Sequence, residues 1–111
     1  MGSVICVEIF EACGIEPRSD FTLDEVRAYG ELLKVNWAEV PIEALRAGMI
    51  VELEHGCEDP RTNVTSDDPL ETAKIAIRHI YEGRDYYPEL AEMEKRLERD
   101  PRGKPQVFQN I

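Results

Sequence analysis

The chain has 111 residues, with 23 acidic and 13 basic side chains and a net charge of −10. This length fits one domain with one core. The acidic balance excludes binding of nucleic acid through its phosphates and argues against docking on an anionic membrane, and no apolar run approaches the ~20 residues of a membrane span.

Helix signals begin close to the N-terminus. Ser3 can cap a first helix that Gly14 ends. Thr22 and Glu25 are spaced as a capping box, in which each side chain binds the backbone amide of the other residue. This pair predicts a second helix that runs to about Lys34.

A third helix is predicted from Pro41, which suits a first helical turn, to Gly56, which ends it. Gly48 lies beside its core-facing row and would permit a close approach of another helix. The core-facing row has spacings of three and four residues and consists of Ile42, Leu45, Met49 and Leu53.

The fourth helix follows a polar loop. Asp68 is its predicted N-cap, Pro69 lies in its first turn and Gly83 ends it. Its main apolar face consists of Leu70, Ala73, Ile77 and Ile80. A second row needs a partner surface, either within the chain or on another subunit, and consists of Thr72, Ile75, His79 and Glu82.

A fifth helix begins at Asp85 or Tyr87 and ends before Pro101, because a residue that precedes proline avoids helical backbone. Tyr86 belongs to its apolar row and is expected in the core, whereas Tyr87 is expected at the surface or in a site. Residues 101–111 are predicted to be extended. Since no segment alternates with a period of two, we predict an all-α fold, a compact single-domain bundle of about five helices.

The acidity is concentrated in one segment. Residues 52–71 carry seven acidic side chains and one basic side chain, a net charge of −6, against −5 for residues 1–51 and +1 for residues 72–111. This segment is either a solvated loop with a charged helix start or a surface that attracts cations.

The chain has two histidines, and each has a carboxylate three residues away, in Glu52-x-x-His55 and His79-x-x-Glu82. Three residues make nearly one helical turn, so each pair projects from one side of its helix. Pairs with this spacing hold metal ions in helical bundles and would suit zinc, iron or manganese. The predicted metal ligands are Glu52, His55, His79 and Glu82, with Asp67, Asp68 and Asp85 as additional candidates.

Helix geometry restricts this hypothesis. In a tight antiparallel hairpin, His55 would sit at the loop end. His79 would lie about ten residues along its helix from that end, roughly 15 Å away at about 1.5 Å per residue. The pairs meet only if the helices run near-parallel, cross with a large stagger or meet across a dimer. Without a metal, His55 would complement the negative end of its helix, and His79 would hydrogen-bond to Glu82.

Cys6, Cys13 and Cys57 form no C-x-x-C pair and are odd in number. We therefore expect no disulfide framework. Cys6 and Cys13, seven residues apart on one helix face, are treated as small buried hydrophobes, and Cys57 is expected in a loop. The N-terminal segment lacks a positive leader and does not read as a signal peptide. A reducing cytoplasm is the expected compartment.

An ordered set of motifs runs through the second half of the chain: V-E-L-E-H-G from Val51, T-N-V-T from Thr62, D-D-P from Asp67, K-I-A from Lys74, then His79, Glu82 and D-Y-Y from Asp85. This set resembles a small all-helical domain family of unknown function that is associated with bacteria and phages. The resemblance covers about Val35 to Leu97. It implies a family-like core over residues 35–99, variable helices over 1–34 and a tail over 100–111.

The resemblance implies shared polar residues but no activity. These residues would be Glu52, Glu54, His55, Asn63, Thr65, Asp68, His79, Glu82, Asp85 and Tyr86.

Two functional hypotheses follow. The first is a small acidic cytoplasmic interaction or accessory domain that self-associates through the second row of the fourth helix. The second is a helical domain that binds zinc, iron or manganese and carries out hydrolytic or redox chemistry. Whether the protein is an enzyme is left open.

Overall fold

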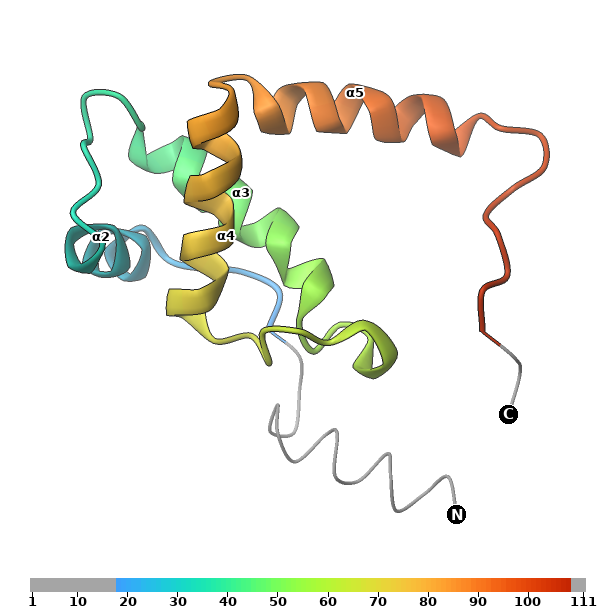
Figure 1. Ribbon diagram of the computed structural model, residues 1–111, viewed down its shortest axis with the longest axis horizontal. Coiled ribbons are helices and arrows are strands. Elements are labelled where there is room, and N and C mark those ends of the chain that lie inside the picture. Colours follow the sequence, from blue (N-terminus) through green and yellow to red (C-terminus); the bar gives the residue numbers. More distant parts are fainter. Residues whose placement is uncertain (1–17, 109–111) are drawn as a thin grey trace, which may run out of the picture.

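The computed structural model describes residues 18–108, which hold helices and no strand. The four α-helices of this range are α2 (Leu23–Leu32), α3 (Ile42–Glu52), α4 (Pro69–Glu82) and α5 (Tyr86–Glu98), with short 3₁₀ turns at Leu53–His55 and Pro60–Thr62 (Figure 1). The all-helical prediction is confirmed, but the described range has four helices rather than about five. The helix expected between Ser3 and Gly14 lies outside it.

Local capping signals set two of the helices. The Thr22 hydroxyl accepts from the Glu25 amide at 3.1 Å, and the Glu25 carboxylate accepts from the Thr22 amide at 2.9 Å, so the predicted capping box is confirmed. The Asp68 carboxylate accepts from two amides in the first turn of α4. This helix ends at Gly83, as predicted.

The end of α3 differs from the prediction. The α-helix stops at Glu52, and the next three residues tighten into a 3₁₀ turn in which the Gly56 amide donates to the Leu53 carbonyl at 2.9 Å. Such tightening satisfies carbonyl groups at a helix end that would otherwise lack partners. Glu52 and His55 therefore lie on consecutive but different helical segments.

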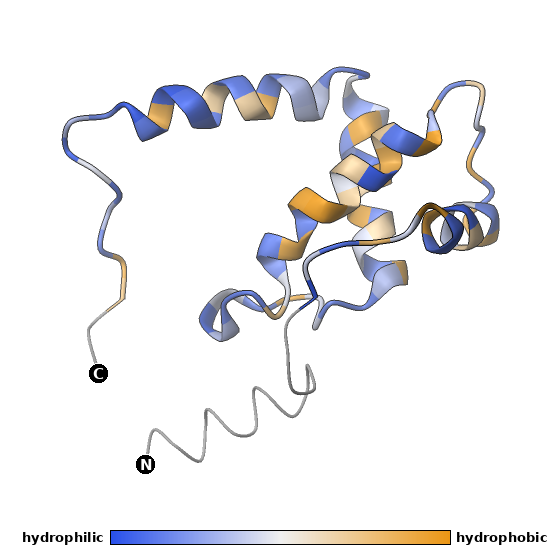
Figure 2. Ribbon diagram, turned by 180° about the vertical axis from the view of Figure 1, so that it is seen from behind, coloured by the Kyte–Doolittle hydropathy of each residue, from blue (hydrophilic) through white to orange (hydrophobic). Residues whose placement is uncertain are grey.

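The core lies between α2, α3 and α4, and the closest association is between α3 and α4, which cross (Figure 1). Hydrophobic residues gather where these two helices lie together (Figure 2). The buried residues of this core are Phe21, Val26, Leu45, Met49, Leu53, Ala73, Ala76 and Ile80.

Helix α5 leaves this three-helix body and projects away from it (Figure 1). Tyr87, in its first turn, is buried, and Leu90 is partly buried against the core. The chain then turns back, and the Arg61 guanidinium lies 4.2 Å from the centre of the Phe108 ring. None of the helices between residues 18 and 108 has the length and apolar character needed to cross a membrane.

Candidate functional site

A buried carboxylate lies where three helices meet. Glu52 ends α3, and its side chain is 4% exposed. The Tyr87 hydroxyl, from α5, donates to Oε1 of Glu52 at 3.0 Å, and Nε2 of His79, from α4, lies 3.4 Å from the same oxygen. Nε2 of His55 lies 3.6 Å from the other oxygen, Oε2. We call these four residues, together with Tyr86, the Glu52 cluster.

Tyr87, expected at the surface or in a site, lies in the cluster, while Tyr86, expected in the core, packs against the core only in part. Tyr87 is buried, whereas Tyr86 is partly exposed and stacks on His79 with ring centres 4.2 Å apart. Gly48 explains the position of Tyr87, because a Cβ at Gly48 would lie 2.5 Å from Cε2 of the tyrosine ring. The close approach that Gly48 was expected to permit is therefore made by this ring.

Burial and charge act on the ionisable groups of the cluster. Burial, and after it the negative charge of Glu52, raises the pKa of the Tyr87 phenol, so this group stays a neutral hydrogen-bond donor. Burial also raises the pKa of the neighbouring Glu54 carboxyl, although His55 opposes the shift. Nε2 of His55 lies 3.4 Å from Oε1 of Glu54.

Two buried polar atoms of the cluster have no hydrogen-bond partner, namely Oε2 of Glu52 and Nδ1 of His79. Oε2 of Glu82 lies 4.0 Å from that nitrogen, beyond hydrogen-bond range. Because buried polar atoms are usually hydrogen-bonded, both of these atoms call for an explanation.

The structure brings three of the four predicted ligands together. His55 and His79 approach the same carboxylate because α3 and α4 cross, so the separation expected for a tight hairpin does not arise. Glu82 lies at the other nitrogen of His79 and pairs with Arg78 at 3.4 Å. Within residues 18–108, no three His, Cys, Asp or Glu side chains already stand in an arrangement that could hold a metal ion.

The additional candidate ligands either accept hydrogen bonds from backbone amides or lie exposed at a helix start. The Asp67 carboxylate accepts from the amides of Arg18 and Cys57, both at 2.7 Å. Asp68 caps α4, and Asp85 is exposed at the start of α5 without a capping hydrogen bond. Much of the acidity between residues 52 and 71 therefore orders a loop and a helix start.

Cys57 is buried and is disulfide-bonded. The expectation of no disulfide framework is therefore corrected at Cys57, which forms one bond. It was also the ground for predicting a reducing compartment, and the disulfide removes that ground.

Two residues of the second row of α4 find a partner surface within the chain. Thr72 is fully buried, and its hydroxyl donates to the Asp68 carbonyl at 2.7 Å. His79, further along the row, packs in the Glu52 cluster. Thr72 and His79 of this row therefore pack within the chain, whereas Ile75 is partly exposed and Glu82 is exposed.

A family model matches residues 26–96 of this chain, which include all of the Glu52 cluster. The chain belongs to the family described as protein of unknown function (DUF5661). The DUF5661 match begins ahead of Val35 and takes in most of α2, in addition to the motifs between Val51 and Tyr87. No curated protein and no solved structure matches the chain.

Proposed function

We propose that this DUF5661 chain is a small interaction domain that associates with a second copy of itself through α5. The observation that carries the proposal is the uncovered apolar side of this helix beyond the body of the molecule. Met93 is 41% exposed there and Leu97 is 59% exposed.

The apolar residues of α5 form one continuous row. Tyr86, Leu90, Met93 and Leu97 follow at spacings of four, three and four, which is the spacing of a coiled-coil seam. The first two pack against the core of their own chain. The last two extend the same seam past the core, where a second helix would cover them.

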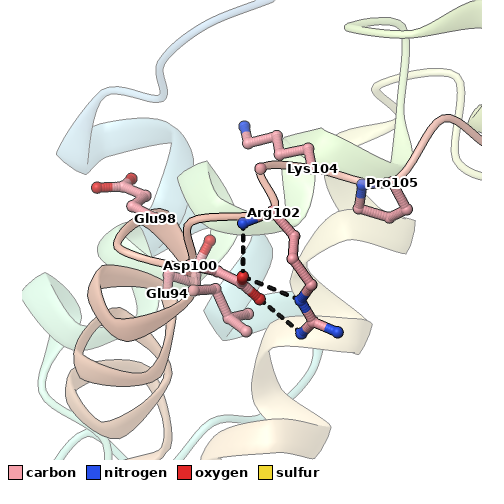
Figure 3. A pocket seen from close by; sticks show the side chains of 8 residues that line it. Glu94, Glu98, Asp100, Arg102, Lys104 and Pro105 are labelled. Atoms are coloured by element: carbon pink, nitrogen blue, oxygen red, sulfur yellow. Dashed lines mark hydrogen bonds and ion pairs between the residues drawn. The ribbon is translucent and has the colours of Figure 1, made fainter.

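A hollow of about 570 Å³ lies beside Leu97, in the bend between the end of α5 and the chain that follows (Figure 3). The Arg102 guanidinium and the Asp100 carboxylate, 2.7 Å apart, hold this bend.

The charges of α5 favour an antiparallel second copy. Glu89 and Glu92 lie in the first half of the helix, whereas Arg96 and Arg99 lie at its end. Antiparallel pairing brings the basic end of each helix toward the acidic half of the other. Opposite charges that flank an apolar seam select partner and orientation in this way.

Sedimentation analysis of the full chain tests this association across a wide range of concentrations. We expect the wild type to form a dimer as concentration rises and Leu97→Glu to remain a monomer, because a charge would enter the seam. Leu32→Glu is the matched control, since Leu32 is an exposed leucine on α2. A wild type that stays monomeric at every concentration, or dimerisation unchanged in Leu97→Glu, contradicts the proposal.

A further inference from the structure

The Glu52 cluster holds a donor set that the interaction at α5 does not use. A carboxylate with two imidazole nitrogens is a set that first-row divalent metals bind, and zinc accepts it with a fourth position left for water. We propose that Glu52, His55 and His79 bind one divalent transition metal ion, with zinc as the best fit. This site is independent of the association through α5.

The unpartnered carboxylate oxygen is the observation that points to a ligand. Oε2 of Glu52 is buried and accepts no hydrogen bond, although His55 Nε2 lies 3.6 Å away. A buried carboxylate oxygen without a partner is costly, and a cation bound to it would offset that cost.

Each histidine nitrogen lies at a distance from a Glu52 oxygen close to that between neighbouring donors in a metal site. In a tetrahedral zinc site with bonds of about 2.0–2.1 Å, neighbouring donor atoms lie about 3.4 Å apart. The Nε2 atoms of His79 and His55 lie 3.4 and 3.6 Å from the carboxylate oxygens of Glu52.

One side chain has to turn before the site can form. The two nitrogens now approach different oxygens of Glu52, which is why no three donors converge on one point among the described residues. His55 is the side chain that can adjust, since it is 48% exposed and ends a 3₁₀ turn. Glu52 and His79 are held in place by their neighbours.

One group orients a donor, and a second group stands near another donor. The Tyr87 hydroxyl holds Oε1 of Glu52 at 3.0 Å, and Glu82 stands 4.0 Å from Nδ1 of His79, the nitrogen that would face away from the metal. A carboxylate at the outer nitrogen of a ligating histidine is the usual partner in metal sites. Glu82, predicted as a ligand from its spacing, stands near this outer nitrogen instead.

Isothermal titration of the full, untagged chain with zinc chloride tests the site. We expect one zinc ion per chain for the wild type. Glu52→Gln and His79→Ala should each lower the affinity by at least about tenfold, and Tyr87→Phe should lower it by about tenfold as an orienting residue. Glu71→Gln is the matched control and should bind as the wild type does, because it removes an exposed carboxylate of the same acidic segment that pairs with Lys74 outside the cluster.

Circular dichroism reports whether the variants at buried residues fold. If they do not, His55→Ala still tests the proposal. Its side chain is half-exposed, so we expect a folded protein with zinc affinity lowered by at least about tenfold. The proposal is overturned if the wild type binds no stoichiometric zinc, or if a folded His55→Ala binds zinc as tightly as the wild type. Dimerisation through α5 has its own readout and is unaffected by either result.

Discussion

The hydrogen bond between Tyr87 and Glu52 joins α5 to α3 inside the molecule. A hydrogen bond to a charged group contributes about 1.5–3 kcal/mol, and its loss leaves a buried carboxylate oxygen with one partner fewer. We expect Tyr87→Phe to lower the free energy of unfolding by about that amount in urea denaturation. Tyr81→Phe, at an exposed tyrosine, should change it by less than about 0.5 kcal/mol.

The raised pKa of Tyr87 also predicts a dependence on pH. Burial raises this pKa in the folded chain, so the unfolded chain loses the phenol proton first as the pH rises past about 10. The stabilisation is therefore complete below about pH 10 and is lost above it, with a slope of up to about 1.4 kcal/mol per pH unit. Urea denaturation at about pH 9 and pH 11 should show a smaller loss in Tyr87→Phe than in the wild type. Equal losses would contradict the prediction.

Gly48 has no side chain, and this leaves room for the ring of Tyr87 against α3. A Cβ there would lie 2.5 Å from the ring, and forced packing of this kind costs about 1–3 kcal/mol. We expect Gly48→Ala to lower the free energy of unfolding by that amount. Gly83→Ala is the control, because a Cβ at Gly83 meets nothing within 4 Å and the backbone there is extended.

At the residue scale, the crossing of α3 and α4 brings His79 to Glu52 and His55. Spacing in the sequence had singled out Glu52 with His55, and His79 with Glu82, as candidate donor pairs. It could not identify Tyr87. Two adjacent tyrosines at a helix start point in directions about 100° apart, and which one faces inward depends on how the helix docks. Gly48, one turn before Glu52, was the signal that a bulky group lies close to α3.

Helix boundaries were predictable where both ends carry a local signal. Helix α4 begins after Asp68 and ends before Gly83 because a cap and a stop residue act within one turn. The end of α3 was not predictable, since its last turn tightens into 3₁₀ geometry before the expected stop at Gly56. The crossing of α3 and α4 arises from packing between distant segments, and that crossing assembles the Glu52 cluster.

The charge pattern of α5 makes a prediction at the scale of the helix. Glu89→Arg alone and Arg96→Glu alone should each weaken dimerisation, because each places like charges beside one another across the antiparallel seam. The double variant restores opposite charges and should recover most of the wild-type affinity. Sedimentation equilibrium measures all three, and a double variant weaker than both single variants would rule out antiparallel pairing.

For the whole molecule, the net charge of −10 opposes the compact state through self-repulsion. Salt screens this repulsion and also weakens exposed ion pairs such as Lys95–Glu92, but exposed pairs contribute little. We expect the melting temperature to rise by a few degrees between low and moderate sodium chloride, since ~1 kcal/mol corresponds to roughly 4–8 °C at this size. A fall over that range would mean that the surface pairs dominate.

The attachment of α5 has a practical consequence. The core contacts of this helix are concentrated in its first half, around Tyr87 and Leu90, while its far half stands away from the three-helix body. A fused reporter domain or a lengthened helix joined at that far half would therefore leave the packing of α2, α3 and α4 intact. The three-helix body therefore holds α5 by its first half alone.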